Sequence, residues 1–178
     1  MSPPNYQNQT GRCRSKRTVL FVGEGPMEKA FLRHVIDCFI QRDGQVTAKA
    51  ENAHGGDPSV VITTAKKLLR QRSYDRCLVL MDTDRSWPAN LPAHIGKTSV
   101  VFVPEEPVIE GLLLRILGHP NITTSTTVAE CKRVLYRNYV DEKRRTNPLG
   151  YKRHFSRGIL ESSRSSCPSL NMILQALE

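Results

Sequence analysis

Two apolar runs of strand length constrain the fold of this chain more than any other feature. Residues 18–22 and 76–81 are almost entirely apolar, and each run is followed by glycine or acidic residues. A strand that is apolar on both faces must be covered on both, which is typical of the parallel sheets of α/β proteins. Pro26 can open a helix after the first run, and apolar residues recur at helical spacing from Met27 to about residue 41. The sequence therefore predicts an α/β fold.

The remaining pattern extends this prediction along the chain. We expect further strands at residues 45–53 and 98–103, an irregular segment at 86–96, and helices at 60–72, 108–117, 128–139, 151–160 and 169–177. This order favours a Rossmann-like, mostly parallel sheet of about four strands flanked by helices, with a helical C-terminal segment. We expect three parts: a disordered basic arm (1–17), a core (18–118) and a helical extension of the same domain (119–178).

The composition narrows the class of partner and the compartment. Lys and Arg number 26 against 17 Asp and Glu, and the formal net charge of +9 favours polyanions such as nucleic acid. The five cysteines include no Cys-x-x-Cys pair, so we expect no disulfide framework, no zinc site and a reducing cytoplasm. No apolar stretch approaches the roughly 18 residues of a membrane helix. The polar N-terminal segment does not resemble a secretory signal.

Acidic residues follow three of the predicted strands. They are Glu24 after the first run, Asp82 and Asp84 after the second, and Glu105, Glu106 and Glu110 after residues 98–103. Sites in parallel sheets form beyond the carboxyl ends of strands, so these acids can converge. In extended chain, residues i and i+2 face the same side, so Asp82 and Asp84 are expected to reach one point. Each acid also has a simpler explanation, as a solvated loop residue or as a charge that caps a helix.

Carboxylates gathered at one point need a cation. Without one they repel each other, and one of them takes up a proton. Mg²⁺ suits such a site because it prefers oxygen ligands and keeps waters and substrate phosphate. Next to a phosphodiester, one or two such ions activate water and stabilise the leaving oxygen. The acids therefore predict a site for Mg²⁺ or Mn²⁺ and the hydrolysis of nucleic acid.

The order of these motifs resembles the Toprim domain of topoisomerases, primases and OLD-type nucleases. The stretch VLFVGEGPMEKAFLRHV is similar to the opening of small Toprim proteins of the RloB-like group, and CLVLMDTDR to their Asp-x-Asp element. PEEPVIEGLLLRILG resembles their third motif. The resemblance covers residues 18–118, with a fainter likeness at 151–177. It implies a Toprim fold and a Mg²⁺- or Mn²⁺-dependent endonuclease acting on DNA or RNA.

Carried over by position, the resemblance implies roles for five acids. Glu24 matches an acid that acts as general acid or base, or as a metal ligand. Asp82 and Asp84 match the metal-binding pair. Glu110 matches the glutamate of the third motif and is implied to assist catalysis, and Glu28 matches the second glutamate of the opening.

The chain departs from the third motif at two positions. Ile109 stands where an aromatic residue is usual, and Gly111 where the residue is usually bulky.

Small proteins of this kind often work beside an ATPase in phage defence, so the resemblance implies an antiviral role and an ATPase partner. A homodimer is one expectation for the oligomeric state.

Four basic residues are candidates for contact with nucleic acid. Arg85 directly follows the Asp-x-Asp element, and Lys152, Arg153 and Arg157 form a basic cluster in the C-terminal segment. Arg85 can instead pair with a neighbouring aspartate, and the other three can form a solvated helix face.

Two rival functions also remain open. They are strand transfer or polymerisation, as in topoisomerases and primases, and a non-catalytic module that binds nucleic acid or a partner protein.

Overall fold

A five-stranded sheet forms the centre of the protein. The computed structural model describes residues 16–41, 44–120, 122–123 and 125–178. The strands are β1 (Arg17–Gly23), β2 (Val46–Asn52), β3 (Arg76–Asp82), β4 (His94–Ile95) and β5 (Thr98–Glu105). Their order is β2-β1-β3-β5-β4, and all pairs are parallel except β4 with β5. The predicted α/β class and mostly parallel sheet are confirmed.

Two details of the expected elements change. The sheet has one strand more than the four expected. This strand is β4, which lies in the segment expected to be irregular, and its two residues are too few to show a strand pattern. The expected basic arm lies outside the described residues up to residue 15, and Arg17 already belongs to β1.

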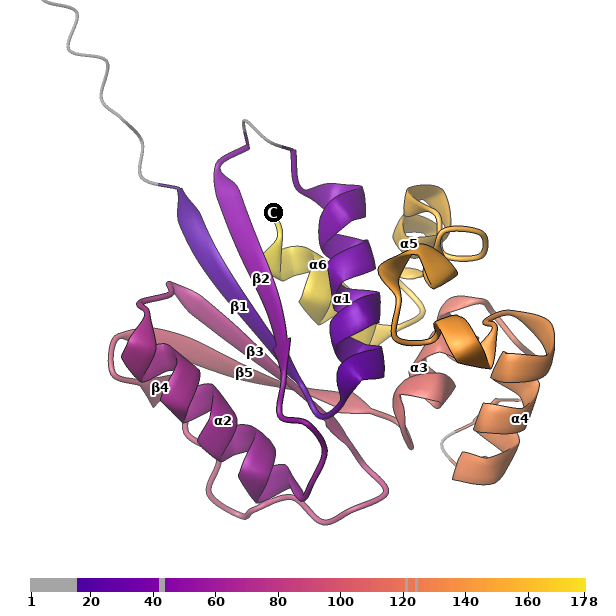
Figure 1. Ribbon diagram of the computed structural model, residues 1–178, viewed down its shortest axis with the longest axis horizontal. Helices are drawn as coiled ribbons and strands as arrows, with labels where there is room; N and C mark the ends of the chain where they lie inside the picture. The colour runs from indigo at the N-terminus through magenta and orange to yellow at the C-terminus, as the bar shows by residue number, and fades with distance from the viewer. Residues whose placement is uncertain (1–15, 42–43, 121, 124) are drawn as a thin grey trace, which may run out of the picture.

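Helices cover both faces of the sheet, as the apolar runs predict. Val19 and Phe21 of β1 pack in one buried cluster with α1 (Pro26–Phe39). Leu20 and Val22 pack in a second cluster with α2 (Pro58–Gln71). Figure 1 shows α1 and α2 on opposite sides of the sheet. The side chains of β1 alternate between two apolar layers, which is why the whole run is apolar.

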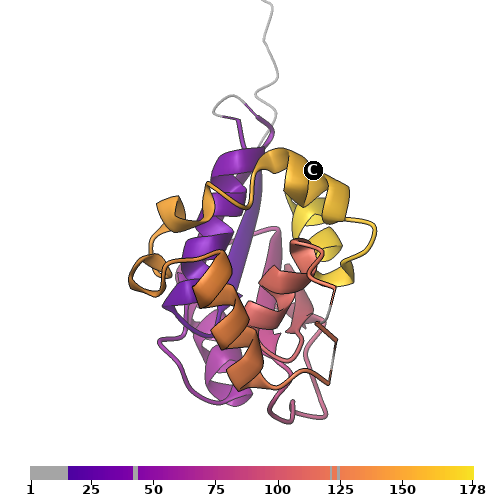
Figure 2. The ribbon, with the colours of Figure 1, turned by 90° about the vertical axis from the view of Figure 1, so that its right-hand side faces the viewer.

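The C-terminal helices gather on the α1 side of the sheet (Figures 1 and 2). They are α3 (Ile109–Ile116), α4 (Val128–Asn138), η1 (Glu142–Arg144), η2 (Pro148–Tyr151), α5 (Arg157–Ser163) and α6 (Pro168–Ala176). Their apolar residues join the cluster of α1, so residues 119–178 share one core with the sheet. Within the described part of the chain, no helix has both the length and the apolarity that crossing a membrane requires.

The helix expected at residues 151–160 is found only from Arg157 onwards. The chain forms η2 up to Tyr151, turns, and begins α5 at Arg157 with Ser156 as N-cap. Tyr151 and Phe155 both pack edge-to-face against Phe31, with ring centroids 5.6 and 5.7 Å away. The turn aims both aromatic rings into the core, so tertiary packing overrides the local pattern.

The order of the strands reverses between β1 and β3. From β1 the chain passes through α1 to β2 on one side, and returns through α2 to β3 on the other side of β1. In open α/β sheets, ligands bind outside the carboxyl ends of the strands where the order reverses in this way. The carboxyl ends of β1 and β3 therefore mark the place to look for a site.

Candidate metal centre

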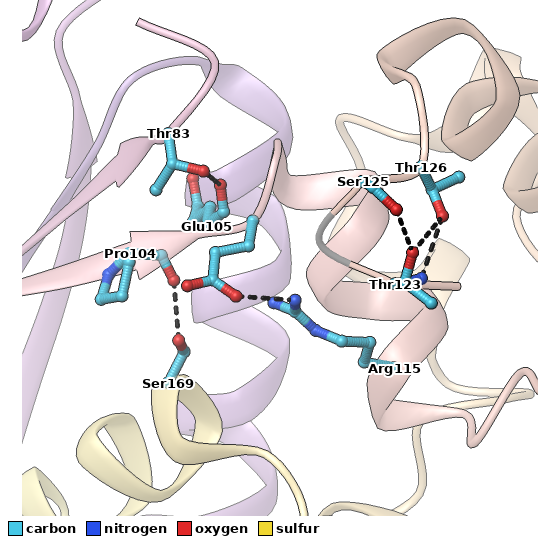
Figure 3. Close-up of polar contacts among 9 residues, drawn as sticks. Thr83, Pro104, Glu105, Arg115, Thr123, Ser125, Thr126 and Ser169 are labelled. Carbon is cyan, nitrogen blue, oxygen red and sulfur yellow. Dashed lines mark hydrogen bonds and ion pairs between the residues drawn. The ribbon is translucent and has the colours of Figure 1, made fainter. Parts of the chain in front are cut away.

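Asp82 and Glu105 end two neighbouring strands. They are direct partners in the parallel register of β3 and β5, so their side chains leave the sheet on the same face. The turn after β3 is fixed to the end of β5, because the N–H of Thr83 donates to the carbonyl oxygens of Glu105 (3.1 Å) and Pro107 (2.9 Å). The Thr83 hydroxyl also donates to the Glu105 carbonyl at 3.4 Å (Figure 3). These contacts keep the two strand ends level.

Glu28 reaches the same place from the first turn of α1. A Cβ on Gly23 would lie 2.4 Å from the Cβ of Glu28, so glycine lets the helix begin directly against the end of β1. The Oε2 atom of Glu28 accepts a hydrogen bond from the N–H of Gly25 at 3.0 Å, which is half of a capping box. Glu28 therefore caps its own helix while its carboxyl group lies at the strand ends.

Glu28, Asp82 and Glu105 form what we call the inner cluster. Each offers a carboxylate oxygen, and the three oxygens lie within 4.8 Å of one another. Glu105 is 0% exposed and Glu28 is 5% exposed. Oδ1 of Asp82 and both carboxylate oxygens of Glu105 are buried without a hydrogen-bond partner. Buried polar atoms without partners are costly and uncommon, so these oxygens require a proton or a cation.

Burial changes the protonation of all three carboxyl groups. It raises the pKa of Asp82 to about 8, and the negative charges of Glu28 and Glu24 add to this rise. It raises the pKa of Glu28 to about 7, against the effect of the backbone N–H groups of Glu28 and Gly25. Burial also raises the pKa of Glu105, with Glu28 and Asp82 contributing. Two ionised carboxylates offer only acceptors, so Asp82 and Glu105 can hydrogen-bond each other only when one is protonated.

The predicted acids Glu24 and Asp84 belong to a second, outer group with Asp57 and Arg85. Arg85 donates to Oδ1 of Asp57 at 3.0 Å, and both side chains are exposed. Burial raises the pKa of the half-buried Glu24, the Arg85 charge opposes this, and the Asp84 and Asp57 charges add to it. Within the described ranges, Glu24, Asp82 and Asp84 do not form a group like the inner cluster.

The reason lies in where β3 ends. The expectation that Asp82 and Asp84 reach one point assumed extended chain through residue 84, but the strand stops at Asp82. The N–H groups of Thr83 and Asp84 both donate to the carbonyl of Pro107, at 2.9 and 3.1 Å, so the chain turns there. Asp84 is consequently exposed, and the roles predicted for it and for Glu24 stay predictions.

Glu110 lies beside the inner cluster and is held by Tyr136. The Tyr136 hydroxyl donates to Oε1 of the buried Glu110 at 2.6 Å. The Glu110 charge also adds to the raised pKa of both Glu28 and Glu105. The glycine at 111 has a local reason, because a Cβ there would lie 2.4 Å from the carbonyl oxygen of Glu106. That glycine allows α3 to start against the end of β5, and Arg115 of α3 pairs with Glu106 at 3.0 Å.

A pocket of about 700 Å³ opens beside the inner cluster. Its acidic lining residues are Glu28, Asp82, Glu110 and Glu142. Its basic lining residues, which we call the basic wall, are Lys132 and Arg133 of α4 and Arg145 after η1. The pocket therefore places carboxylates and cations around one space, an arrangement suited to a phosphate bound beside a metal ion.

The four basic residues chosen from the sequence lie elsewhere. Arg85 pairs with Asp57, and the guanidinium of Arg157 lies over the ring of Phe39, 5.0 Å from its centroid. Arg153 lines a different pocket, between α4 and η2, and Lys152 is exposed. None of the four lines the pocket beside the inner cluster. Their predicted contact with nucleic acid stays a prediction.

Glu28 and Glu105 were not among the acids that the sequence predicted to bind the metal. A usable signal existed for Glu105, since it lies two residues after the buried Val103 and therefore faces the same side of β5. For Glu28 the signal was its place in the first turn of a helix that follows β1 closely. No comparable signal marked the basic wall, because the fold of the C-terminal segment brings α4 to the site.

Comparison of the chain with protein-family models, with curated proteins and with solved structures gave no significant match. The case for a function therefore rests on the site itself.

The inner cluster fits a hard divalent cation. Its donors are carboxylate oxygens, the ligands that Mg²⁺ and Mn²⁺ prefer. Three of these oxygens are buried without a partner, and a cation would satisfy them and keep the carboxylates ionised. Glu28, Asp82 and Glu105 would hold the ion, with Glu24 and Asp84 on the side of the outer group.

Proposed function

We propose that the protein is a metal-dependent nuclease that hydrolyses phosphodiester bonds in DNA or RNA, with a Toprim-type arrangement of acids at the strand ends. The observation that carries this proposal is the carboxylate of Glu105. It is 0% exposed, its two oxygens lack partners, and it lies in a three-carboxylate cluster beside a pocket that also contains cations. A Mg²⁺ or Mn²⁺ ion is the simplest partner for such a group.

The residues of the chain divide the chemical work. When bound, the cation lowers the pKa of water and stabilises charge on the phosphate and on the leaving oxygen. The inner cluster, which consists of Glu28, Asp82 and Glu105, would hold the cation in place. Glu24 would accept the proton of the attacking water, the role that the resemblance of the sequence motifs implies, and burial raises the pKa of this half-buried carboxylate. Cations of the pocket would hold the phosphate oxygens while the water oxygen bonds to phosphorus and the bond to the leaving oxygen breaks, and the leaving oxygen then takes a proton from solvent.

Cleavage by matched variants tests the proposal. Wild type, Asp82→Asn, Glu105→Gln and Asp37→Asn are incubated with plasmid, single-stranded DNA and total RNA in Mg²⁺ or Mn²⁺. Asp37 is an exposed residue at the other end of the helix that carries Glu28, so its substitution controls for the loss of one negative charge away from the site. We expect cleavage by the wild type and by Asp37→Asn, and none by the two cluster variants. Equal behaviour of all four proteins on every substrate would end the proposal.

Metal binding separates the nuclease from the rival reading, a non-catalytic binding module. Isothermal titration with Mn²⁺ should show binding to the wild type that Glu105→Gln abolishes. In a non-catalytic module, the inner cluster would only cap α1 and share protons between its carboxyl groups. Such a module would show no carboxylate-dependent Mn²⁺ binding. The ATPase partner and the role in phage defence rest on the resemblance of the sequence motifs and stay predictions.

A further inference from the structure

The pocket beside the inner cluster has one acidic and one basic side. Three of the acids, Glu28, Asp82 and Glu110, come from the first turns of α1 and α3 and from the end of β3. The basic wall comes from α4 and from the segment after η1, and the fourth acid, Glu142 of η1, pairs with Arg145 on that side. α4 packs against α3, and Figure 2 shows the two helices side by side. Segments separated by more than a hundred positions of sequence thus form one cavity.

Tyr136 fixes the basic wall relative to the acids. Its hydroxyl group donates to Oε1 of Glu110 at 2.6 Å. The Sδ atom of Met27 lies 3.3 Å from the hydroxyl oxygen of Tyr136. α4 is therefore tied to the first turns of α3 and α1, which also carry Glu110 and Glu28. The hydroxyl of Tyr136 therefore links the α4 side of the pocket to the side that carries Glu110 and Glu28.

The cations of the basic wall can be reached by a ligand. Lys132 is exposed and makes no ion pair or hydrogen bond with any other residue that the structure describes. Arg133 pairs with Glu130 at 2.6 Å and Arg145 pairs with Glu142 at 2.9 Å, and all four side chains are substantially exposed. Exposed ion pairs contribute little to stability. A phosphate entering the pocket can therefore take over either guanidinium.

We infer that this pocket takes a single strand of nucleic acid, and that the basic wall holds the phosphate next to the one being cut. The inference rests on the proposed nuclease function and deepens it by naming the class of substrate. The cavity of about 700 Å³ has the size of a small-molecule site, so it admits a few nucleotides and not a rigid duplex. Glu28 lines the cavity and is only 5% exposed, so the scissile phosphate must enter the cavity to approach this part of the inner cluster.

Single strands can make this entry because their backbone is flexible and their bases are unstacked. A phosphate beside the inner cluster then has its neighbour within the same small cavity, where the cations of α4 lie. Both DNA and RNA present the same phosphates, so the basic wall selects the single strand and not the sugar.

Binding measurements test this inference without requiring cleavage. Fluorescence anisotropy compares single-stranded DNA, single-stranded RNA and the DNA duplex of the same sequence, in Ca²⁺ and at one salt concentration, with a gel to show that each probe stays intact. The proteins are wild type, Lys132→Glu/Arg145→Glu, and the control Lys66→Glu/Lys67→Glu. The control removes two exposed charges of α2, on the opposite face of the sheet.

We expect both single strands to bind more tightly than the duplex. We also expect the double variant of the basic wall to lose about tenfold or more in affinity, because two phosphate contacts are reversed in sign. The α2 control should change affinity by less than about twofold. Unchanged Mn²⁺ binding by the basic-wall variant would show that its inner cluster is intact.

Two results would overturn the inference: tight duplex binding equal to that of the single strands, or an equal loss of affinity in the α2 control. The proposed function fails in a different way. A wild type that binds single strands through the basic wall but cleaves nothing in Mn²⁺ would contradict the nuclease and leave the assignment of the binding surface in place.

Discussion

The inner cluster and the outer group are two sets of acids at the carboxyl end of the parallel strands, and their negative charges are neutralised in different ways. In the outer group, Arg85 lies against Asp57 at 3.0 Å in an exposed pair. In the inner cluster, the three carboxylates lie within 4.8 Å of one another and no cationic side chain pairs with them in the described structure. Charges that water or an arginine already compensates need no metal. The difference teaches that burial without a partner, more than acidic composition, marks the candidate centre.

The largest effect that would sharpen this comparison is on catalysis. Glu105→Gln and Asp82→Asn should each lower metal-dependent cleavage by more than about 100-fold, because loss of a direct ligand exceeds the usual cost of losing a supporting contact. Asp84→Asn, in the outer group, should lower cleavage by about tenfold or less. Initial rates over a range of Mn²⁺ concentrations measure both effects. A larger loss in Asp84→Asn than in Glu105→Gln would reverse the assignment of the two groups.

The next effect is on the pH dependence of stability. The pKa of Glu28 rises to about 7 and that of Asp82 to about 8 in the folded protein, above their ordinary values. The stability that protonation of these groups confers is present at acidic pH and is lost as the pH rises through 7 and 8. For Glu28 alone this loss is about 3 kcal/mol. Burial raises the pKa of Glu105 as well, and Glu105→Gln removes that contribution. In EDTA the wild type should therefore lose more stability between pH 5 and 9 than Glu105→Gln does.

Thermal unfolding with and without Mn²⁺ checks this expectation. Mn²⁺ at pH 8 should raise the melting temperature of the wild type and leave Glu105→Gln unchanged, because the ion replaces the protons of the inner cluster. An identical pH profile for the two proteins in EDTA would show that the inner cluster is not strained by its own charge.

A smaller effect should come from the corner between β5 and α3. Gly111→Ala places a Cβ 2.4 Å from the carbonyl oxygen of Glu106, so the helix must shift, at a cost of about 1–3 kcal/mol. Gly158 of α5 has nothing within 4 Å of the corresponding position, and Gly158→Ala should stabilise the protein by about 0.4–1 kcal/mol. Urea unfolding compares the two. Equal stability of both variants would contradict the tight approach of α3 to the inner cluster.

The smallest effect is expected in the outer group. Arg85→Gln removes an exposed ion pair with Asp57, and such pairs contribute about 0–1 kcal/mol. The free energy of unfolding from urea titration should change within that range. A cost well above this range would mean that the outer group is as tightly organised as the inner one.

The fold could be predicted because its signals are local. The apolar runs at β1 and β3 and the helical spacing in α1 depend on residues that are neighbours in sequence. The failures have long-range causes. Phe155 is drawn into the core by Phe31, which the pattern around residues 151–160 does not contain.

The site was only partly predictable for a related reason. Asp82 was placed at the correct edge of the sheet, because strand ends can be located from the sequence. Which acids join it depends on the pairing of β3 with β5 and on how closely α1 begins after β1. Neither the register that sets Asp82 beside Glu105 nor the arrival of α4 at the pocket is written in a local pattern.

The direct pairing of Asp82 with Glu105 makes the centre sensitive to strand alignment. A slip of one residue between β3 and β5 would turn one of the two carboxylates to the opposite face of the sheet, towards α2. Misaligned chains would then lack the complete ligand set and gain nothing from the ion. A divalent cation present during folding would therefore stabilise only the molecules whose central strands have paired in the correct register, and would increase their share of the population.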